Sequence, residues 1–207
     1  MATALLRRYT DLPATLALLR NSEITLLPPE SWDDRNDRWV MQAYARARGL
    51  KTLLALCFSE AAETYHHWKV FAPGSSGICI EFDKERLLGA LPTANLRHEK
   101  VRYKTIKQIK EPAPHPDGLP FGKRLAFKDE VEYRVIFESK RQLVTSRRVP
   151  FPSNAIRRVI VSPWLPDALF DSTAQAIKET AGENKVAVVQ SRLIASPSWG
   201  EFAAMYA

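Results

Sequence analysis

Two short, almost wholly apolar runs constrain the fold of this chain more than any other feature. They are TLLALCF at residues 52–58 and GICIEF at residues 77–82, and polar residues bound both. Runs of this length that end at turn residues are typical of strands that are covered on both faces. We therefore expect a central sheet that is flanked by helices.

The segments around these runs mix helical and extended patterns in no regular order. Helices are predicted at residues 12–20, 31–48, 63–72, 84–91 and 164–182. Further strands are predicted at residues 24–27, 96–103, 131–139, 156–162 and 185–193. Because strands and helices do not alternate regularly, we expect an α+β protein with a mixed, largely antiparallel sheet. A chain of 207 residues fits a single domain over residues 1–207.

The predicted helix at residues 31–48 carries clear end signals. Ser31 is the expected N-cap, Asp34 its capping-box partner, and Gly49 the left-handed residue that ends the helix. The side chains that follow the 3.6-residue period, and that we expect to be buried, are Trp39, Val40, Ala43, Tyr44 and Ala47.

Composition excludes several classes of protein. Hydrophobic residues make up 45% and charged residues 26%, which excludes a disordered chain, a collagen-like fibre and a coiled coil. No run of about 18 apolar residues is present, so we expect no membrane span. The N-terminus places its arginines after a short apolar stretch, the reverse of a secretory signal. Cys57 and Cys79 lie in apolar runs, so we expect reduced core thiols and a cytoplasmic protein.

The net charge of +7 is concentrated in one segment. Residues 97–148 carry 14 Lys/Arg against 7 Asp/Glu, and the remaining residues balance. Such a surplus favours nucleic acid or phosphate ligands, although a solvated face kept for solubility is the alternative. Within it, residues 111–120 open a proline-rich stretch that we expect to be a functional or mobile loop. Residues 139–207 show no recognisable chemistry and are expected to complete the core.

Three aspartates lie close together at the start of the predicted helix. Asp33, Asp34 and Asp37 either complement the helix dipole or gather a hard cation through water ligands. A metal-dependent nuclease would use Asp33 and Asp37, or alternatively Glu81 and Asp83, to bind Mg²⁺. We favour the dipole interpretation and expect no metal.

A second acidic cluster opens the predicted strand at residues 131–139. Alternation places Glu130, Glu132 and Arg134 on one side of that strand. Two carboxylates and a guanidinium are costly to bury unless they pair or serve a ligand. The alternatives are therefore a structural ion pair between Glu132 and Arg134, or a binding site.

A third cluster places two histidines before a tryptophan. His66 and His67 diverge on a helix, and no HExxH or CxxC spacing accompanies them. We expect one of them, assigned to His67, to be either a hydrogen-bonding residue of a cleft or a structural histidine. Trp68 is predicted to line the same cleft as Glu132.

Four of these motifs, in order, resemble a bacterial family known as domain of unknown function 2971. The strings that carry the resemblance are ITLLPPESWDDRND, ALCFSE, HHWKVFAPGSSGICIEFD and KDEVEYRVI. The match covers residues 5–137, and the family also begins with an arginine-and-tyrosine strand. Asn36-Asp37-Arg38 stands where the family commonly has Asn-Asp-Pro, which indicates a divergent subgroup.

The motif order is also similar, more distantly, to that of ADP-ribosyltransferase-like proteins. This resemblance implies that Arg8 (or Arg7), on a strand with Tyr9, would hold the phosphates or ribose of NAD. It further implies that Phe58 and Ser59 would flank the nicotinamide.

The same resemblance implies two catalytic carboxylates. Glu132 would hold a ribose hydroxyl and stabilise an oxocarbenium-like transition state, and Glu130 would complete a Glu-x-Glu motif. Arg134 is expected to bind substrate beside them. Breaking a glycosidic bond to a cationic leaving group needs such a carboxylate in a dry slot.

Three functions therefore stay open from the sequence. One is an ADP-ribosyl-transferring or NAD-cleaving enzyme of toxin or phage-defence type that acts on nucleic acid or protein. Another is a non-catalytic module that binds nucleic acid or a nucleotide through the basic residues 97–148. The third is the metal-dependent nuclease.

Overall fold

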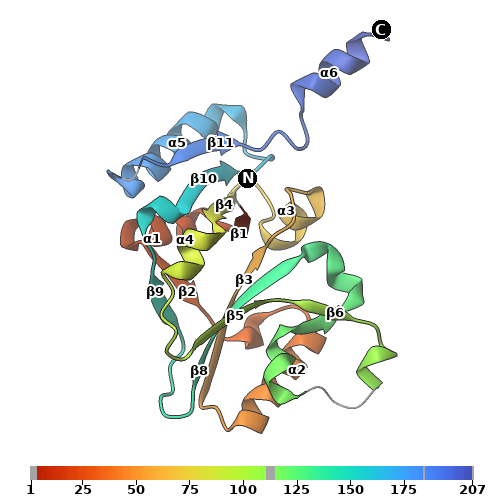
Figure 1. The fold of residues 1–207 in the computed structure, drawn as a ribbon. Helices are drawn as coiled ribbons and strands as arrows, with labels where there is room; N and C mark the ends of the chain where they lie inside the picture. Colours follow the sequence, from red (N-terminus) through yellow and green to blue (C-terminus); the bar gives the residue numbers. More distant parts are fainter. Residues whose placement is uncertain (1–3, 111–114, 184, 207) are drawn as a thin grey trace. The chain divides into compact units, whose positions relative to one another are not determined.

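The computed structural model describes residues 4–110, 115–183 and 185–206 (Figure 1). The chain forms two compact units, each assembled from separated segments. Unit 1 comprises residues 1–22, 61–89 and 152–207, and unit 2 comprises residues 23–60 and 90–151. The single domain over residues 1–207 stays a prediction. Among the described residues, no helix has the length and apolar character needed to cross a membrane.

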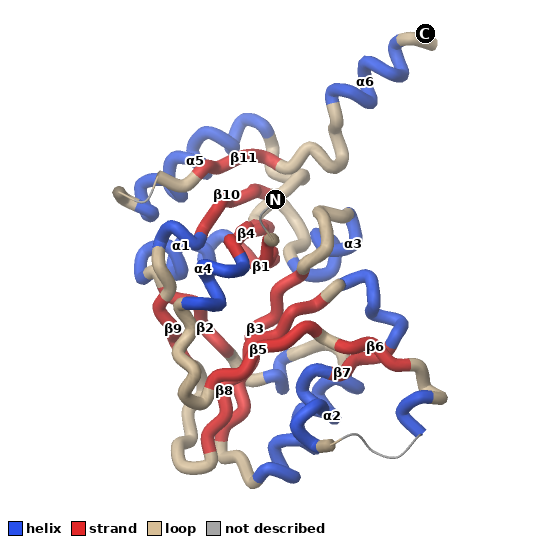
Figure 2. The backbone as a smooth tube through the Cα atoms, in the orientation of Figure 1, coloured by secondary structure: helices blue, strands red, loops and turns tan. Residues whose placement is uncertain are grey.

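Unit 1 is built on a mixed sheet whose strands are ordered β11-β10-β4-β1. β4 pairs antiparallel with both β1 and β10, whereas β11 pairs parallel with β10. These strands are β1 (Leu5–Asp11), β4 (Gly77–Asp83), β10 (Ile156–Val161) and β11 (Ala187–Gln190). The helices are α1 (Leu12–Asn21), α3 (Tyr65–Phe71), α4 (Lys84–Gly89), α5 (Asp167–Ala181) and α6 (Pro197–Ala204). Helix α5 lies along β11 in both views (Figures 1 and 2).

Unit 2 is built on an antiparallel sheet in which β8 lies between β3 and β5 (Figure 2). The strands of this sheet are β3 (Thr52–Ser59), β5 (Leu96–Lys100) and β8 (Glu132–Ser139). Two smaller pairings join β2 (Glu23–Leu26) to β9 (Arg147–Pro150), and β6 (Arg102–Lys104) to β7 (Gly122–Arg124). The unit's helix is α2 (Arg35–Arg48), and 3₁₀ turns include Pro116–Phe121 and Leu125–Glu130.

The predicted α+β class with a mixed, largely antiparallel sheet and flanking helices is confirmed. The two apolar runs form β3 and β4, and every residue of β4 is buried. This burial explains why both strands read as continuous apolar runs, since neither face of such a strand meets water.

Helix α2 begins later than Ser31, and of the five side chains predicted to be buried only Tyr44 is fully buried. Asp34 is the N-cap, and its carboxylate accepts a hydrogen bond of 2.9 Å from the Asn36 N–H. Trp39 is 63% exposed, whereas the buried side chains of the helix are Asp37, Met41 and Tyr44. The prediction was right for Tyr44 and wrong for Trp39, because it assigned the apolar stripe to the largest ring, although a paired carboxylate, Asp37, occupies the buried face.

Several shorter elements differ from the prediction or were absent from it. The sequence pattern missed β1, β9 and α6, although the family resemblance implied an arginine-and-tyrosine strand where β1 lies. The sequence analysis assigned no element to Gly122–Arg124, which forms β7, or to Leu125–Glu130, which forms a 3₁₀ turn. Residues 111–114 of the proline-rich stretch lie outside the described residues, and Pro116–Phe121 is a 3₁₀ helix that buries Pro120 and Phe121.

Residues 139–207 contribute buried side chains from some of their elements, and the role expected for the whole segment stays a prediction. The last three residues of β10 and the side chains of Ala174, Ile177 and Ala181 on α5 are buried in unit 1. Helix α6 buries none of its side chains among the described residues, so it adds nothing to a core.

Candidate functional site

One face of β8 packs against α2, with polar groups at both ends of the contact and apolar groups between them. On β8 this face carries every second side chain: Glu132, Arg134, Ile136 and Glu138. The first turn of α2 meets Arg134 through Asp37, and its middle packs Met41 in one apolar cluster with Ile136. Farther along the helix, the Tyr44 hydroxyl donates to the Glu138 carboxylate at 2.8 Å.

Arg134 is completely buried and is surrounded by acceptors. Its Nε donates to Glu132 Oε1 at 2.7 Å, and its two terminal nitrogens donate to the two Asp37 oxygens at 3.1 and 2.7 Å. The Pro120 carbonyl accepts a further bond at 2.7 Å. This bidentate geometry is the strongest form of a charge-assisted hydrogen bond. The predicted pairing of Glu132 with Arg134 on one face is therefore present.

Lys123 brings the second predicted carboxylate into the same group. Its ammonium lies 2.5 Å from Glu130 Oε2, 3.1 Å from Glu132 Oε2 and 3.7 Å from Asp37 Oδ2. We call Asp37, Lys123, Glu130, Glu132 and Arg134 the Arg134 cluster. With all five groups ionised, three carboxylates face two cations, which leaves an excess of one negative charge.

The two glutamates of the cluster titrate in opposite directions. Burial alone would raise the pKa of Glu132, but Arg134 and Lys123 outweigh it and lower that pKa to about 2. Burial raises the pKa of Glu130 above its ordinary value, and Lys123 offsets this only in part. Carboxylates whose pKa values are driven apart are the usual signature of a division into an ionised group and a proton carrier.

The backbone between the two glutamates is strained. Val131 has a φ of +42°, in the left-handed region that β-branched residues avoid. The Glu132 N–H donates to the Tyr103 hydroxyl at 2.8 Å, and the Ser59 hydroxyl donates to the Glu130 carbonyl at 2.6 Å. Ser59 thus lies at the cluster as a backbone support.

Cys57 and two aromatic rings border the cluster. Cys57 is the register partner of Arg134, and its thiol lies beside Glu132. Burial raises the pKa of this thiol, which makes it a poor nucleophile. The Trp32 ring lies 4.7 Å from the Arg134 guanidinium carbon, and Phe127 lies 5.0 Å from the Lys123 ammonium.

Three further predicted site residues, Tyr9, His67 and Trp68, lie in unit 1 and form an aromatic group, whereas Phe58 belongs to unit 2. Tyr9 is buried, stacks on His67 at 5.3 Å between ring centroids and meets Trp68 edge to face at 5.4 Å. The Trp68 indole donates to Glu63 Oε1 at 2.7 Å, and the His67 Nδ1 lies 2.6 Å from the Thr64 hydroxyl. Tyr9, His67 and Trp68 are therefore brought together. The sequence analysis missed Glu63.

The arginines of β1 point to opposite faces of the strand. Arg7 donates from Nε to Glu81 Oε1 at 2.8 Å, and Arg158 holds the other oxygen of Glu81 at 2.5 Å. Arg8, the residue that the resemblance favoured, is half-buried and alternates with Arg7 along β1.

The structure assigns the predicted residues to both units. Trp68 belongs to unit 1 and Glu132 to unit 2, so the prediction that they share one cleft stays a prediction. The sequence analysis assigned Asp37 to the helix dipole or to a cation and not to Arg134, and it missed Lys123. Asp37 had a usable signal, because it lies four residues before Met41 on a helical face, and a charge in that position needs a partner. Lys123 had none, since it lies among other basic residues.

Three of the four carboxylates proposed for a metal-dependent nuclease have other partners. Glu81 lies between two guanidiniums, Asp37 pairs with Arg134, and Asp83 caps α4 through the Arg86 N–H at 3.1 Å. Within the described ranges, no group of three or more His, Cys, Asp or Glu side chains has the arrangement to hold a metal ion.

Comparisons with known proteins found distant structural likenesses only. No protein-family model matches the chain, and no curated protein matches it by sequence. The domain of unknown function 2971 therefore stays an expectation. A structure of Thermus sp. 2.9 DarT in complex with ADP-ribosylated ssDNA aligns at a TM-score of 0.48 and 9% identity, over 92% of this chain and 95% of that chain. The same protein in complex with NAD+ aligns at 0.47 and 10% identity, over 93% and 97%. At TM-scores below 0.5 these likenesses carry no argument about function.

Proposed function

We propose that the protein is an NAD⁺-cleaving enzyme that transfers ADP-ribose, and that Glu132 and Glu130 are its catalytic residues. One observation carries the proposal: two buried carboxylates, two positions apart, share the Lys123 ammonium and have pKa values driven in opposite directions. A structural ion pair with Lys123 would require only one of these two carboxylates.

Glu132 has the properties needed to stabilise a developing cation. Its pKa of about 2 keeps it ionised at any physiological pH, and two cations fix its orientation. When the bond between ribose and nicotinamide breaks, its electron pair leaves with the neutral nicotinamide and positive charge develops on the ribose. A preorganised carboxylate lowers the energy of that state without reorganisation.

Glu130 has the properties of the general base. Its raised pKa brings its proton affinity closer to neutral pH, which favours proton transfer. The acceptor's proton would pass to Glu130 as the acceptor bonds to the ribose carbon, and then to water. Departure of nicotinamide itself needs no proton, so the two glutamates act at separate steps.

Substrate access in this proposal depends on Lys123. Glu132 is 4% exposed, so a ribose hydroxyl reaches its carboxylate only when the Lys123 ammonium moves away from Oε2. The half-buried rings of Trp32 and Phe127 lie against the two cations and would exclude water from this slot.

The test is NAD⁺ turnover by purified protein, followed as nicotinamide release by mass spectrometry. We expect the Glu132→Gln variant to lose about 10²-fold or more of this activity, as expected when a preorganised electrostatic group is removed. Glu130→Gln should impair transfer to an acceptor more than it impairs nicotinamide release.

Glu81→Gln is the matched control, because it makes the same change at an equally buried carboxylate that lies between two guanidiniums, outside the Arg134 cluster. Circular dichroism and a urea melt establish that each variant is folded under the assay conditions. Wild-type protein that releases no nicotinamide, with or without nucleic acid, contradicts the proposal. So does a folded Glu132→Gln variant with wild-type turnover.

A further inference from the structure

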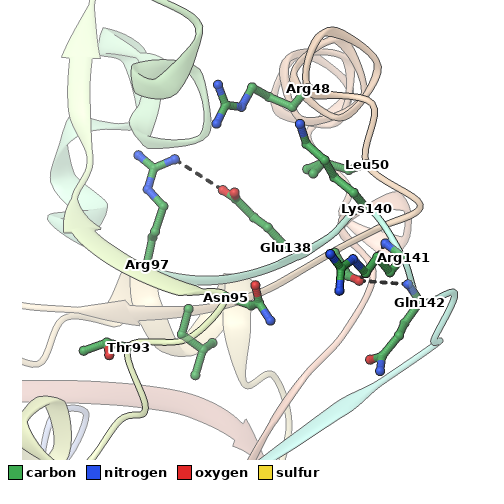
Figure 3. Close-up of a pocket in the computed structure, with 11 residues that line it drawn as sticks. Arg48, Leu50, Thr93, Asn95, Arg97, Glu138, Lys140, Arg141 and Gln142 are labelled. Carbon is green, nitrogen blue, oxygen red and sulfur yellow. Dashed lines mark hydrogen bonds and ion pairs between the residues drawn. The ribbon is translucent and has the colours of Figure 1, made fainter.

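Unit 2 contains a cavity of about 700 Å³ that is separate from the Arg134 cluster (Figure 3). It is formed by the end of α2, the segment that enters β5, and the end of β8 with the turn that follows. The charged side chains that line it are Arg48, Arg97, Glu138, Lys140 and Arg141. Four cations thus surround one carboxylate.

The carboxylate of the cavity is already held in place. Glu138 accepts from the Tyr44 hydroxyl at 2.8 Å and from Arg97 at 3.2 Å, the contact drawn in Figure 3. Arg97 is further fixed by the Asp117 carbonyl at 2.8 Å. One acid therefore offsets one of the four cations, and the lining keeps a surplus of three positive charges.

The other three cations are available to a ligand to different degrees. Arg48 has a half-exposed partner, Asp117, at 3.2 Å, a type of pair that contributes little. The exposed side chains of Lys140 and Arg141 have no carboxylate partner within the described part of the chain. In Figure 3, Arg48 and Lys140 extend toward the same side of the cavity as Arg97.

We propose that this cavity holds backbone phosphates of a nucleic-acid strand. Phosphate oxygens suit the planar fork of arginine, and several phosphates in a row suit cations distributed around a cavity of this size. Small-molecule sites are mostly apolar with few polar groups, whereas this lining is dominated by charge. Unit 2 as a whole carries 19 Lys/Arg against 13 Asp/Glu, so its field attracts a polyanion.

The cavity lies away from the reacting groups of the proposed enzyme. Glu132 and Glu138 are at opposite ends of β8, which at roughly 3.3 Å per residue separates them by about 20 Å. The cavity would therefore anchor an acceptor strand beyond the point of reaction. This role deepens the proposed function and rests on it, but the binding itself involves no NAD⁺.

The test is fluorescence anisotropy with a labelled single-stranded 20-mer oligonucleotide and no NAD⁺. We expect wild-type binding to weaken steeply between 50 and 200 mM salt. The double variant Lys140→Gln/Arg141→Gln should raise the dissociation constant about tenfold or more. It should also reduce the salt slope by about 1 to 2, since each phosphate contact contributes about 0.7 for a single strand.

Arg124→Gln/Lys128→Gln is the matched control, because it removes the same charge from exposed positions of unit 2 that do not line the cavity. It should change the dissociation constant much less. An equal loss in both double variants would show diffuse attraction and would overturn the proposal. No wild-type binding at 50 mM salt would overturn it as well.

Competitors and catalytic variants separate the remaining outcomes. Displacement of the oligonucleotide by equimolar mononucleotide, inorganic phosphate or poly-glutamate would assign the cavity to that ligand and contradict a strand. Glu132→Gln should bind the oligonucleotide as wild type does. Lys140→Gln/Arg141→Gln should keep any NAD⁺ cleavage measured without nucleic acid, so failure of one proposal is distinguishable from failure of the other.

Discussion

Val131 adopts a φ of +42° and a ψ of +52°, a left-handed backbone that a β-branched residue accepts only under strain. The turn at Val131 directs both Glu130 and Glu132 to the Lys123 ammonium. Glu130 lies in a 3₁₀ turn outside the strand, so regular strand alternation does not account for its position. Strain of about 1 to 3 kcal/mol persists where surrounding contacts enforce it, and it concentrates at functional sites. Here the enforcing groups are the hydroxyls of Tyr103 and Ser59.

Replacing Val131 by glycine and by alanine tests this strain directly. Both changes remove the side chain, but only glycine removes the left-handed penalty of roughly 1 to 2 kcal/mol. We expect Val131→Gly to be more stable than Val131→Ala by about 1 kcal/mol in urea unfolding. At an ordinary strand position the order is the reverse, so an alanine variant that is the more stable would show that Val131 is not left-handed.

Arg134 is the residue on which the buried carboxylates depend. Arg134→Met leaves Asp37 and Glu132 without their guanidinium, and such a loss costs about 3 to 5 kcal/mol. The matched change is Arg158→Met, which breaks a guanidinium pair with Glu81 whose arginine is 47% exposed. That change should cost about 1 kcal/mol or less. Equal losses in the two urea midpoints would contradict the central role of Arg134.

At the scale of elements, the sequence pattern predicted an element where the residues that determine it lie within its own segment. The strands β3 and β4 and the helix α1 follow from apolar runs and turn residues within their own segments. The short β9 and α6 were missed because neither has a buried face long enough to show a period. The start of α2 was wrong because Ser31 and Asp34 are both good N-caps in sequence, and only tertiary packing selects between them.

The N-cap of α2 can be tested with three single substitutions. Asp34→Ala removes the acceptor for the Asn36 N–H and should cost about 1 kcal/mol. Asp33→Ala removes an exposed carboxylate one residue earlier, and Ser31→Ala removes the cap that the sequence favoured. Both should stay within about 0.5 kcal/mol of wild type by thermal unfolding. A larger loss of stability from Ser31→Ala would indicate that the helix begins after Ser31, as the sequence predicted.

At the scale of the whole molecule, the sequence predicted the pairing of Glu132 with Arg134 better than it predicted the other residues that contact them. Glu132 and Arg134 were identified from strand alternation, because residues two apart share a face, whereas Glu130 lies in a 3₁₀ turn before β8 and joins them through the left-handed Val131. Lys123 reaches them only through the fold of the segment between β6 and β8, which no periodicity records. The aromatic group of Tyr9, His67 and Trp68 likewise joins β1 to α3, two elements about 55 residues apart in the chain.

The opposite pKa shifts of the two glutamates predict how stability depends on pH. Glu132 has a folded pKa of about 2 against an ordinary 4.5, so its contribution is present above pH 4.5 and lost as pH falls toward 2. That shift corresponds to about 3 kcal/mol. Glu130 has a raised folded pKa, so its contribution is present below pH 4.5 and is lost as pH rises from 4.5 through the folded pKa. Urea midpoints measured from pH 2 to 8 should therefore respond differently to the two glutamine variants.

The two variants should remove different limbs of that profile. Glu132→Gln should flatten the loss of stability below pH 4.5, because glutamine does not titrate and so binds no proton that could distinguish the folded from the unfolded state. Glu130→Gln should leave the acid limb and reduce the decline above pH 4.5, since a neutral amide carries no penalty for burial of charge. Asp129→Asn, which changes an exposed neighbouring carboxylate, should follow wild type throughout. If both glutamine variants flatten the same limb of the profile, the two carboxylates titrate alike. That result would contradict the division of roles between Glu132 as the ionised group and Glu130 as the base.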